Sequence, residues 1–157
     1  MNKFHKALTT VLGLGYAPIA PGTFGSIGAF FCCYLLSQIH GVQTYNILIV
    51  VASVLLTIIG IWSTNKLTPE WGEDPSKVVL DEYIGYIITL LFVPFTLKYL
   101  LLALLLFRFF DILKPLGIRY IDTHIKGGTG VMLDDVLAGI YACASLHFWI
   151  WLEPRLF

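Results

Sequence analysis

The stretch VMLDDVLAGIYACASLHFWIWL (Val131–Leu152) decides the class of fold, because it is long and apolar enough to form a membrane-crossing helix. A helix needs about 20 residues to cross a hydrocarbon core of ~30 Å, and Tyr45–Trp62 is a second run of suitable length. Of the 157 residues, 57% are hydrophobic and 13% are charged. An average soluble domain carries about 25% charged residues, so the composition excludes an ordinary water-soluble globule.

Two further apolar runs complete the pattern. Phe24–Ile39 is short and contains glycines, so we expect it to cross only with tilt or to lie partly in the interface. Val78–Phe110 is too long for one span, and the proline and lysine of Pro94–Lys98 (PFTLK) mark the place where two antiparallel helices would meet. The sequence therefore predicts an all-α fold, an integral membrane bundle of about four to five hydrophobic helices.

The positive charges predict the orientation of this bundle. Most of them precede the first run, follow the second, or surround the segment before the last: Lys3, Lys6, Lys66, Lys77, Arg108, Lys114, Arg119 and Lys126. The connections His40–Thr44 and Pro94–Lys98 carry one lysine between them. By the positive-inside rule, the N-terminus and the loops at 63–77 and 108–130 face the cytoplasm. Basic and acidic residues balance at 10 each, which gives no overall field to attract nucleic acid.

Five carboxylates are embedded in apolar sequence, each at the expected cytoplasmic end of its helix: Asp81, Glu82, Asp111, Asp134 and Asp135. A charged carboxylate inside a membrane costs about 2.5–3.5 kcal/mol on insertion scales, so such acids usually face a bundle interior and have a partner. Helix capping and the helix dipole could explain a single acid in a first turn. They do not explain Asp111, which lies near a helix C-terminus.

A cluster of these five acids would repel itself unless a cation compensated its charge. Oxygen ligands without cysteine or paired histidine select Mg²⁺, Mn²⁺ or Ca²⁺ over Zn²⁺. We therefore expect a divalent-metal site at the inner membrane surface, formed by Asp81, Glu82, Asp111, Asp134 and Asp135.

Basic residues accompany the acids at a regular spacing. Arg108, Asp111 and Lys114 recur every three residues and share one helix face. They form either a salt-bridge ladder with an anchoring role, or a phosphate site in which the two bases hold phosphate oxygens and Asp111 holds the metal. The two interpretations are compatible.

Two glycine-containing loops belong to the same membrane face. In Ala17–Ser26 (APIAPGTFGS), the backbone N–H groups of Gly22, Thr23 and Gly25 could receive an anion at a helix N-terminus. In Lys126–Gly130 (KGGTG), glycine allows a head group to approach the backbone closely, beside the charge of Lys126.

Four blocks in this order resemble the phosphatidylglycerophosphatase A family: APGTFGS (Ala20–Ser26), LDEYIG (Leu80–Gly85), FRFFDILKP (Phe107–Pro115) and GGTGVMLDDVLAG (Gly127–Gly139). The last block is the most specific. One departure is visible, because Gly117 stands where the family pattern K-P-x-P has a proline.

The resemblance implies a single domain over residues 1–157, a Mg²⁺-dependent lipid phosphatase of the bacterial inner membrane. Such an enzyme hydrolyses the terminal phosphomonoester of phosphatidylglycerophosphate to phosphatidylglycerol and phosphate. The catalytic acids would be the five carboxylates above, and the motif bases would be Arg108 and Lys114.

Two questions stay open at the level of sequence. No serine or cysteine stands in an activating context, which favours direct attack by water, although an aspartyl-phosphate on Asp81, Asp134 or Asp135 is an alternative. A small cation transporter or channel is the alternative function, since acids in membrane helices also mark ion pathways. Its acids would be expected near the membrane midplane rather than at one end.

Overall fold

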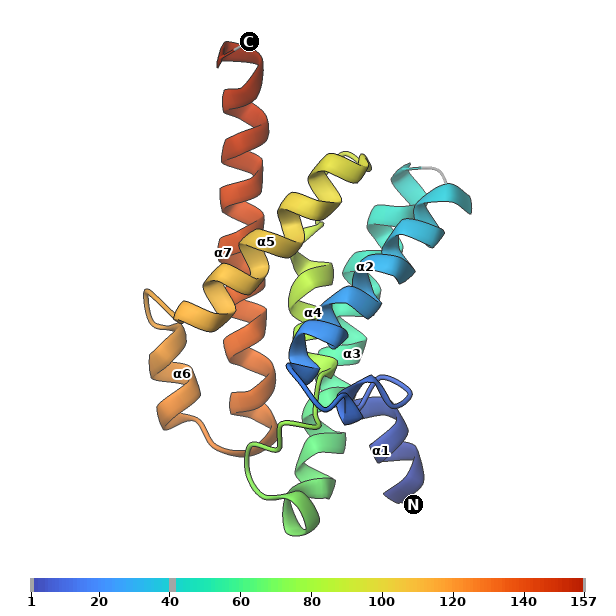
Figure 1. Ribbon diagram of the computed structural model, residues 1–157, viewed down its shortest axis with the longest axis vertical. Coiled ribbons are helices and arrows are strands. Elements are labelled where there is room, and N and C mark those ends of the chain that lie inside the picture. Colours follow the sequence, from blue (N-terminus) through green and yellow to red (C-terminus); the bar gives the residue numbers. More distant parts are fainter. Residues whose placement is uncertain (1, 40–41, 157) are drawn as a thin grey trace.

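The computed structural model describes residues 2–39 and 42–156, and all regular elements in these ranges are helical (Figure 1). The elements are α1 (Asn2–Thr9), the short 3-10 helix η1 (Leu14–Tyr16), α2 (Pro21–Ile39), α3 (Val42–Trp71), α4 (Leu80–Thr89), α5 (Leu97–Leu113), α6 (Ile118–His124) and α7 (Gly127–Leu156). The predicted all-α bundle is confirmed, with its hydrophobic runs in α2, α3, α4, α5 and α7. The connection expected at His40–Thr44 is described only from Val42, since residues 40–41 lie outside the described ranges.

Two helices of the described chain are long and apolar enough to cross a membrane, α3 over Asn46–Trp71 and α7 over Gly127–Arg155. Large apolar side chains on their outer surfaces, and on those of α2 and α5, lack cover. Leu105 is 68% exposed and Phe148 is 61% exposed. Water-soluble proteins rarely expose apolar surface on this scale, whereas lipid covers it at no cost. The protein is therefore a membrane protein.

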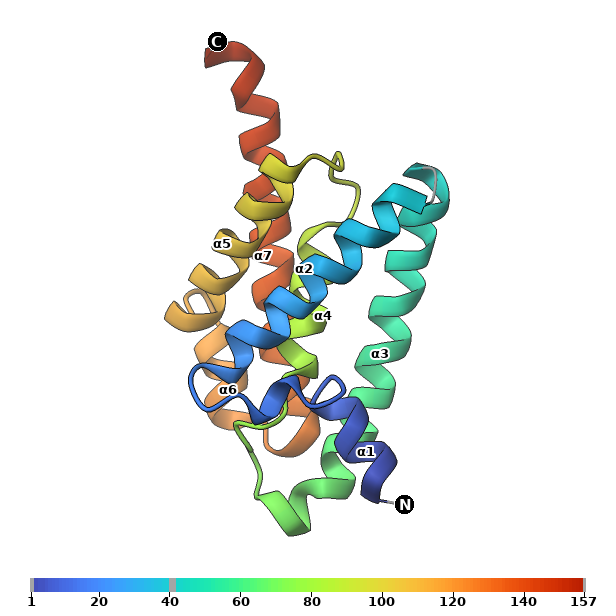
Figure 2. The ribbon, with the colours of Figure 1, turned by 45° about the vertical axis from the view of Figure 1, so that its right-hand side comes forward.

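The long apolar run Val78–Phe110 divides into two antiparallel helices, as its proline predicts (Figures 1 and 2). The first of them, α4, has only 10 residues and reaches about 15 Å at 1.5 Å per residue, half of the hydrocarbon core. Beyond its end, the Leu91 carbonyl oxygen accepts hydrogen bonds from His147 Nε2 at 2.9 Å and Cys143 Sγ at 3.7 Å, both on α7. These bonds satisfy a polar group that lipid could not.

Helices α4 and α7 pack at very short range through glycine. A Cβ atom on Gly139 would lie 2.5 Å from the Gly85 carbonyl oxygen, and one on Gly85 would lie 2.8 Å from the Asp135 carbonyl oxygen. Neither position has room for a side chain, so the two backbones approach directly. This contact places the acids at the start of α4 beside those near the start of α7.

The segments predicted to share one face do lie at one end of the bundle, the lower end in Figure 1. They are α1, the connection after α3, and the region from the end of α5 through α6 to the start of α7. The prediction of a loop over residues 63–77 was wrong in its first half, because α3 continues to Trp71 and the connection covers residues 72–79. Helix α1 is attached to α3 by a hydrogen bond between His5 Nδ1 and Ser63 Oγ at 3.1 Å and by an ion pair between Lys6 and Glu70.

Candidate active site

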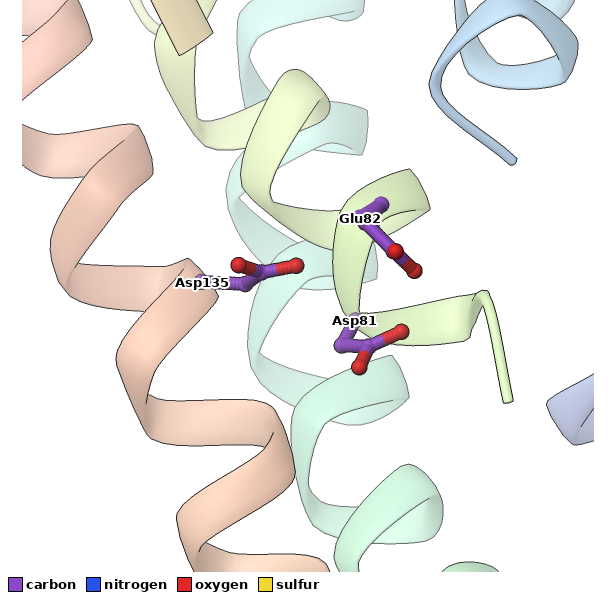
Figure 3. Close-up of side chains that lie close together, drawn as sticks. All are labelled: Asp81, Glu82 and Asp135. Carbon is purple, nitrogen blue, oxygen red and sulfur yellow. The ribbon is translucent and has the colours of Figure 1, made fainter. Parts of the chain in front are cut away.

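Three of the predicted acids form a compact cluster between α4 and α7. Asp81 and Glu82 occupy the first turn of α4, and Asp135 faces them from α7 (Figure 3). One carboxylate oxygen of each residue lies within 4.8 Å of the others. Asp81 and Asp135 are buried, so their charges are poorly screened by water. Three ionised carboxylates at this separation would repel each other strongly.

The acid cluster and the neighbouring Asp134 also offer carboxylate oxygens that accept no hydrogen bond among the described residues. Among the described residues, Asp81 Oδ1, Glu82 Oε2 and Asp134 Oδ1 are buried and accept no hydrogen bond. Buried polar atoms are normally paired, and an orphaned carboxylate oxygen is especially unfavourable. Oxygen atoms of this kind are the ligands of hard divalent cations. The cluster is therefore suited to bind a metal ion.

The other two predicted acids, Asp111 and Asp134, are paired with basic residues. Arg108 forms an ion pair with Asp111, one helical turn away, and its Nη1 lies 3.9 Å from Glu82 Oε1. Lys114 Nζ lies 2.5 Å from Asp134 Oδ2. Arg108 and Asp111 thus share a face of α5 that turns toward the acid cluster, as predicted. Lys114 was expected on the same helix face, but it follows the last residue of α5 in a left-handed conformation, so the turn after the helix and not the helical spacing sets its position.

A cavity of about 380 Å³ connects these groups. All five predicted acids line it, together with Arg108, Lys114, Lys126 and Gly22. The Glu82 carboxylate lies directly against Gly22, in the space that a Cβ atom at position 22 would take, so any side chain there would displace this carboxylate. Thr23 is not among the lining residues, and its N–H donates to the Ala20 carbonyl oxygen at 3.0 Å. The APGTFGS segment therefore closes one wall of the cavity around Glu82.

The turn between α5 and α6 places Lys114 at the cavity. Lys114 ends α5 in a left-handed conformation with φ 47°, and Gly117 precedes α6 with φ 91°. Proline cannot adopt this φ, so the glycine at position 117 gives a turn that the family's K-P-x-P pattern could not form. Burial lowers the pKa of Lys114, but hydrogen bonds to Asp122 and Asp134 and their charges outweigh it and hold that pKa above its usual value.

Sequence reasoning missed four polar residues at or beside the cavity. Asp122 on α6 lines it and lies 2.7 Å from Lys114 Nζ, measured to Oδ1. Glu73 and Asp74 line its rim from the 72–79 connection. Asn65 Oδ1 on α3 accepts a hydrogen bond of 2.7 Å from the N–H of Gly128, in the first turn of α7. All four belong to polar segments, where such residues are ordinary and carry no signal in a single sequence.

The contact of Asn65 with α7 leads to a test of how the Lys126–Gly130 segment is held. We expect Asn65→Ala to lower the free energy of unfolding by about 1 kcal/mol, since the Gly128 N–H loses its acceptor at a helix N-terminus. Thermal unfolding in detergent measures the change. Asn65→Asp keeps an acceptor oxygen and should unfold close to the wild-type temperature. An unchanged melting temperature for Asn65→Ala would contradict the capping role.

The fold and the cavity together define the class of this protein. It is a helical membrane protein with a buried site at one end of its bundle, where carboxylates are arranged to bind a cation. The family model described as Phosphatidylglycerophosphatase A matches residues 7–150. The chain therefore belongs to the phosphatidylglycerophosphatase A family, as the four sequence blocks indicated.

Individual relatives agree with this assignment. A Haemophilus influenzae protein named phosphatidylglycerophosphatase A is 36% identical over 155 residues, covering 96% of this chain and 92% of the relative. An Escherichia coli protein of the same name is 33% identical over 149 residues, covering 94% and 83%. A Bacteroides thetaiotaomicron protein, provisionally named a phosphatidylinositol-3-phosphatase, is 46% identical over 139 residues, covering 85% of both chains. No solved structure matches the chain.

Proposed function

We propose that this protein is a phosphatidylglycerophosphatase, which hydrolyses the terminal phosphomonoester of phosphatidylglycerophosphate to phosphatidylglycerol and phosphate. The observation that carries the proposal is one cavity in which a cation-competent acid cluster adjoins Arg108 and Lys114. Phosphoryl transfer depends on positioning and charge stabilisation, which this combination supplies. The names of the Haemophilus influenzae and Escherichia coli relatives support the choice of substrate.

In this proposal the basic residues bind the substrate phosphate. Arg108 and Lys114 are each paired with a carboxylate, and a phosphate group offers both of them additional oxygen acceptors. Lys126 is exposed at the cavity and attracts the anionic head group. The apolar outer faces of the helices keep the acyl chains in the bilayer while the head group enters the cavity.

The acid cluster would hold a divalent cation, which we propose to be Mg²⁺. Asp81, Glu82 and Asp135 would be its ligands, and Asp111 and Asp134 line the same cavity. When bound, the ion stabilises the phosphoryl oxygens and makes an attacking water easier to ionise.

Hydrolysis also needs a base for the attacking water and a proton for the leaving glycerol oxygen. Asp134 is the best-placed base, because Lys114 fixes its Oδ2 while its Oδ1 is buried and accepts no hydrogen bond from the described residues. The Lys114 ammonium, adjacent to the same carboxylate, can return a proton to the leaving oxygen. The proton that Asp134 takes from the water then passes to the neighbouring Lys114 amine, which restores both side chains. The net reaction adds water across the P–O bond.

We place the active site on the cytoplasmic side of the bacterial inner membrane. The positive-inside distribution supports this orientation, because the basic loops gather at the end of the bundle that contains the cavity. The same location argues against an ion pathway, which would place acids along the membrane interior rather than at one end.

Metal removal and a substrate panel test the proposal. We expect purified protein to release phosphate from phosphatidylglycerophosphate, to lose this activity in EDTA, and to recover it when excess Mg²⁺ is added. Phosphatidic acid and phosphatidylinositol 3-phosphate complete the panel, because one relative bears the name of an enzyme acting on the latter. Full activity in chelator would contradict the metal role, and faster release from phosphatidylinositol 3-phosphate would contradict the proposed substrate.

A further inference from the structure

Lys114 is held from two sides by carboxylates on different helices. Its Nζ donates to Asp134 Oδ2 on α7 at 2.5 Å and to Asp122 Oδ1 on α6 at 2.7 Å. Both distances are short, as expected for hydrogen bonds between charged groups. The mechanism above uses Lys114 and Asp134 and leaves Asp122 without a role.

The second carboxylate changes where the ammonium can point. A lysine ammonium has three N–H donors, and within the described chain two of them are engaged by Asp122 and Asp134. Two fixed acceptors determine the direction of the third N–H, because the donors are arranged tetrahedrally. With Asp134 as its sole acceptor, the ammonium could rotate freely about that one contact. It would also neutralise Asp134 more completely.

We propose that Asp122 is a positioning residue, which holds the Lys114 ammonium at the cavity so that its third N–H meets a phosphate oxygen of the lipid. This inference rests on the proposed function for the identity of the substrate. Asp122 lines the same cavity as Lys114 and Asp134, so the directed N–H and an entering phosphate share one space.

Contacts that do not involve Asp122 hold α6 in place. The effect of Asp122 on Lys114 can therefore be tested without disturbing the packing of the helix. Ile118 at the start of α6 is fully buried, and Tyr141 on α7 donates a hydrogen bond of 2.8 Å to the Leu116 carbonyl oxygen. The Asp122 side chain remains 34% exposed and makes its one ion pair with Lys114 within the described residues. Its replacement should therefore leave the helix packed.

A double-mutant cycle in the full-length protein tests the proposal. We expect Asp122→Ala, which removes the acceptor, to raise KM about tenfold with a smaller effect on kcat, and Asp122→Glu to keep KM within about threefold of the wild type. In a Lys114→Met background, Asp122→Ala should have no further effect, because both changes remove the same hydrogen bond. Glu73→Gln is the matched control, an acid at the same cavity that forms no ion pair with Lys114 among the described residues. It should leave KM unchanged.

A second readout does not depend on turnover. Inorganic phosphate should raise the melting temperature of the wild-type protein, with a midpoint concentration about tenfold higher for Asp122→Ala and unchanged for Glu73→Gln. Additive effects in the cycle, an unchanged midpoint, or no phosphate effect on the wild type would overturn the role of Asp122. A wild type that is stabilised by phosphate but hydrolyses no lipid would instead contradict the proposed function alone.

Discussion

Replacing Asp81 by asparagine is expected to reduce kcat about a thousandfold while the protein stays folded. Asp81 is buried in the acid cluster, and one of its oxygens is an unused ligand atom among the described residues. Asparagine keeps the size of the side chain and one oxygen but removes the charge that attracts a cation. Initial rates of phosphate release at saturating lipid and Mg²⁺ measure the effect.

Stability provides an independent check on the same variant. Because Asp81, Glu82 and Asp135 repel one another, Asp81→Asn should melt at the same or a higher temperature than the wild type in chelator. The rise in melting temperature that Mg²⁺ produces in the wild type should be much smaller in the variant. Asp74→Asn is the control, an exposed acid at the cavity rim that should retain both activity and the Mg²⁺ response. Wild-type kcat in Asp81→Asn would refute the assigned role.

Replacing Gly139 by alanine is expected to reduce activity about a hundredfold and to lower the melting temperature. The added Cβ atom would lie 2.5 Å from the Gly85 carbonyl oxygen, so α4 and α7 must separate. Asp135 lies one turn before Gly139 on α7, and its distance from Asp81 and Glu82 depends on this contact. A misplacement of about 1 Å in a catalytic constellation costs about 10²-fold in rate.

The control for Gly139→Ala is Ala144→Val, which adds two methyl groups at an exposed position of the same helix. We expect it to retain both activity and melting temperature, measured by phosphate release and by thermal unfolding in detergent. Equal behaviour of the two variants would show that the close packing of α4 on α7 does not position the site.

The sequence was informative where a residue type conflicts with its surroundings. Acids in apolar runs are costly, so Asp81, Asp111 and Asp135 could be selected without coordinates, and the structure places all three at one cavity. The basic loops likewise predicted which segments share an end of the bundle. Asp122 could not be found in this way, since an acid in a polar segment violates no expectation.

Long-range contacts explain the remaining differences. The apolar run around α4 is long enough to predict a helix that crosses the membrane, but α4 ends after 10 residues. The Leu91 carbonyl oxygen just beyond its end accepts a hydrogen bond from His147, more than fifty positions away along the chain. Thr23 was expected to offer its N–H to an anion, yet the first turn of α2 uses that N–H internally. Nothing in the sequence indicates that His147 bonds to the end of α4 or that the Thr23 N–H bonds to the Ala20 carbonyl oxygen.

The contact between Gly22 and Glu82 joins the first turn of α2 to the first turn of α4. A methyl group at position 22 would enter the volume of the Glu82 carboxylate, which is the flexible end of its side chain and can swing aside. A substitution of Gly22 would therefore keep the polypeptide fold and redirect one acid of the site, so this glycine governs the aim of a side chain sixty residues away.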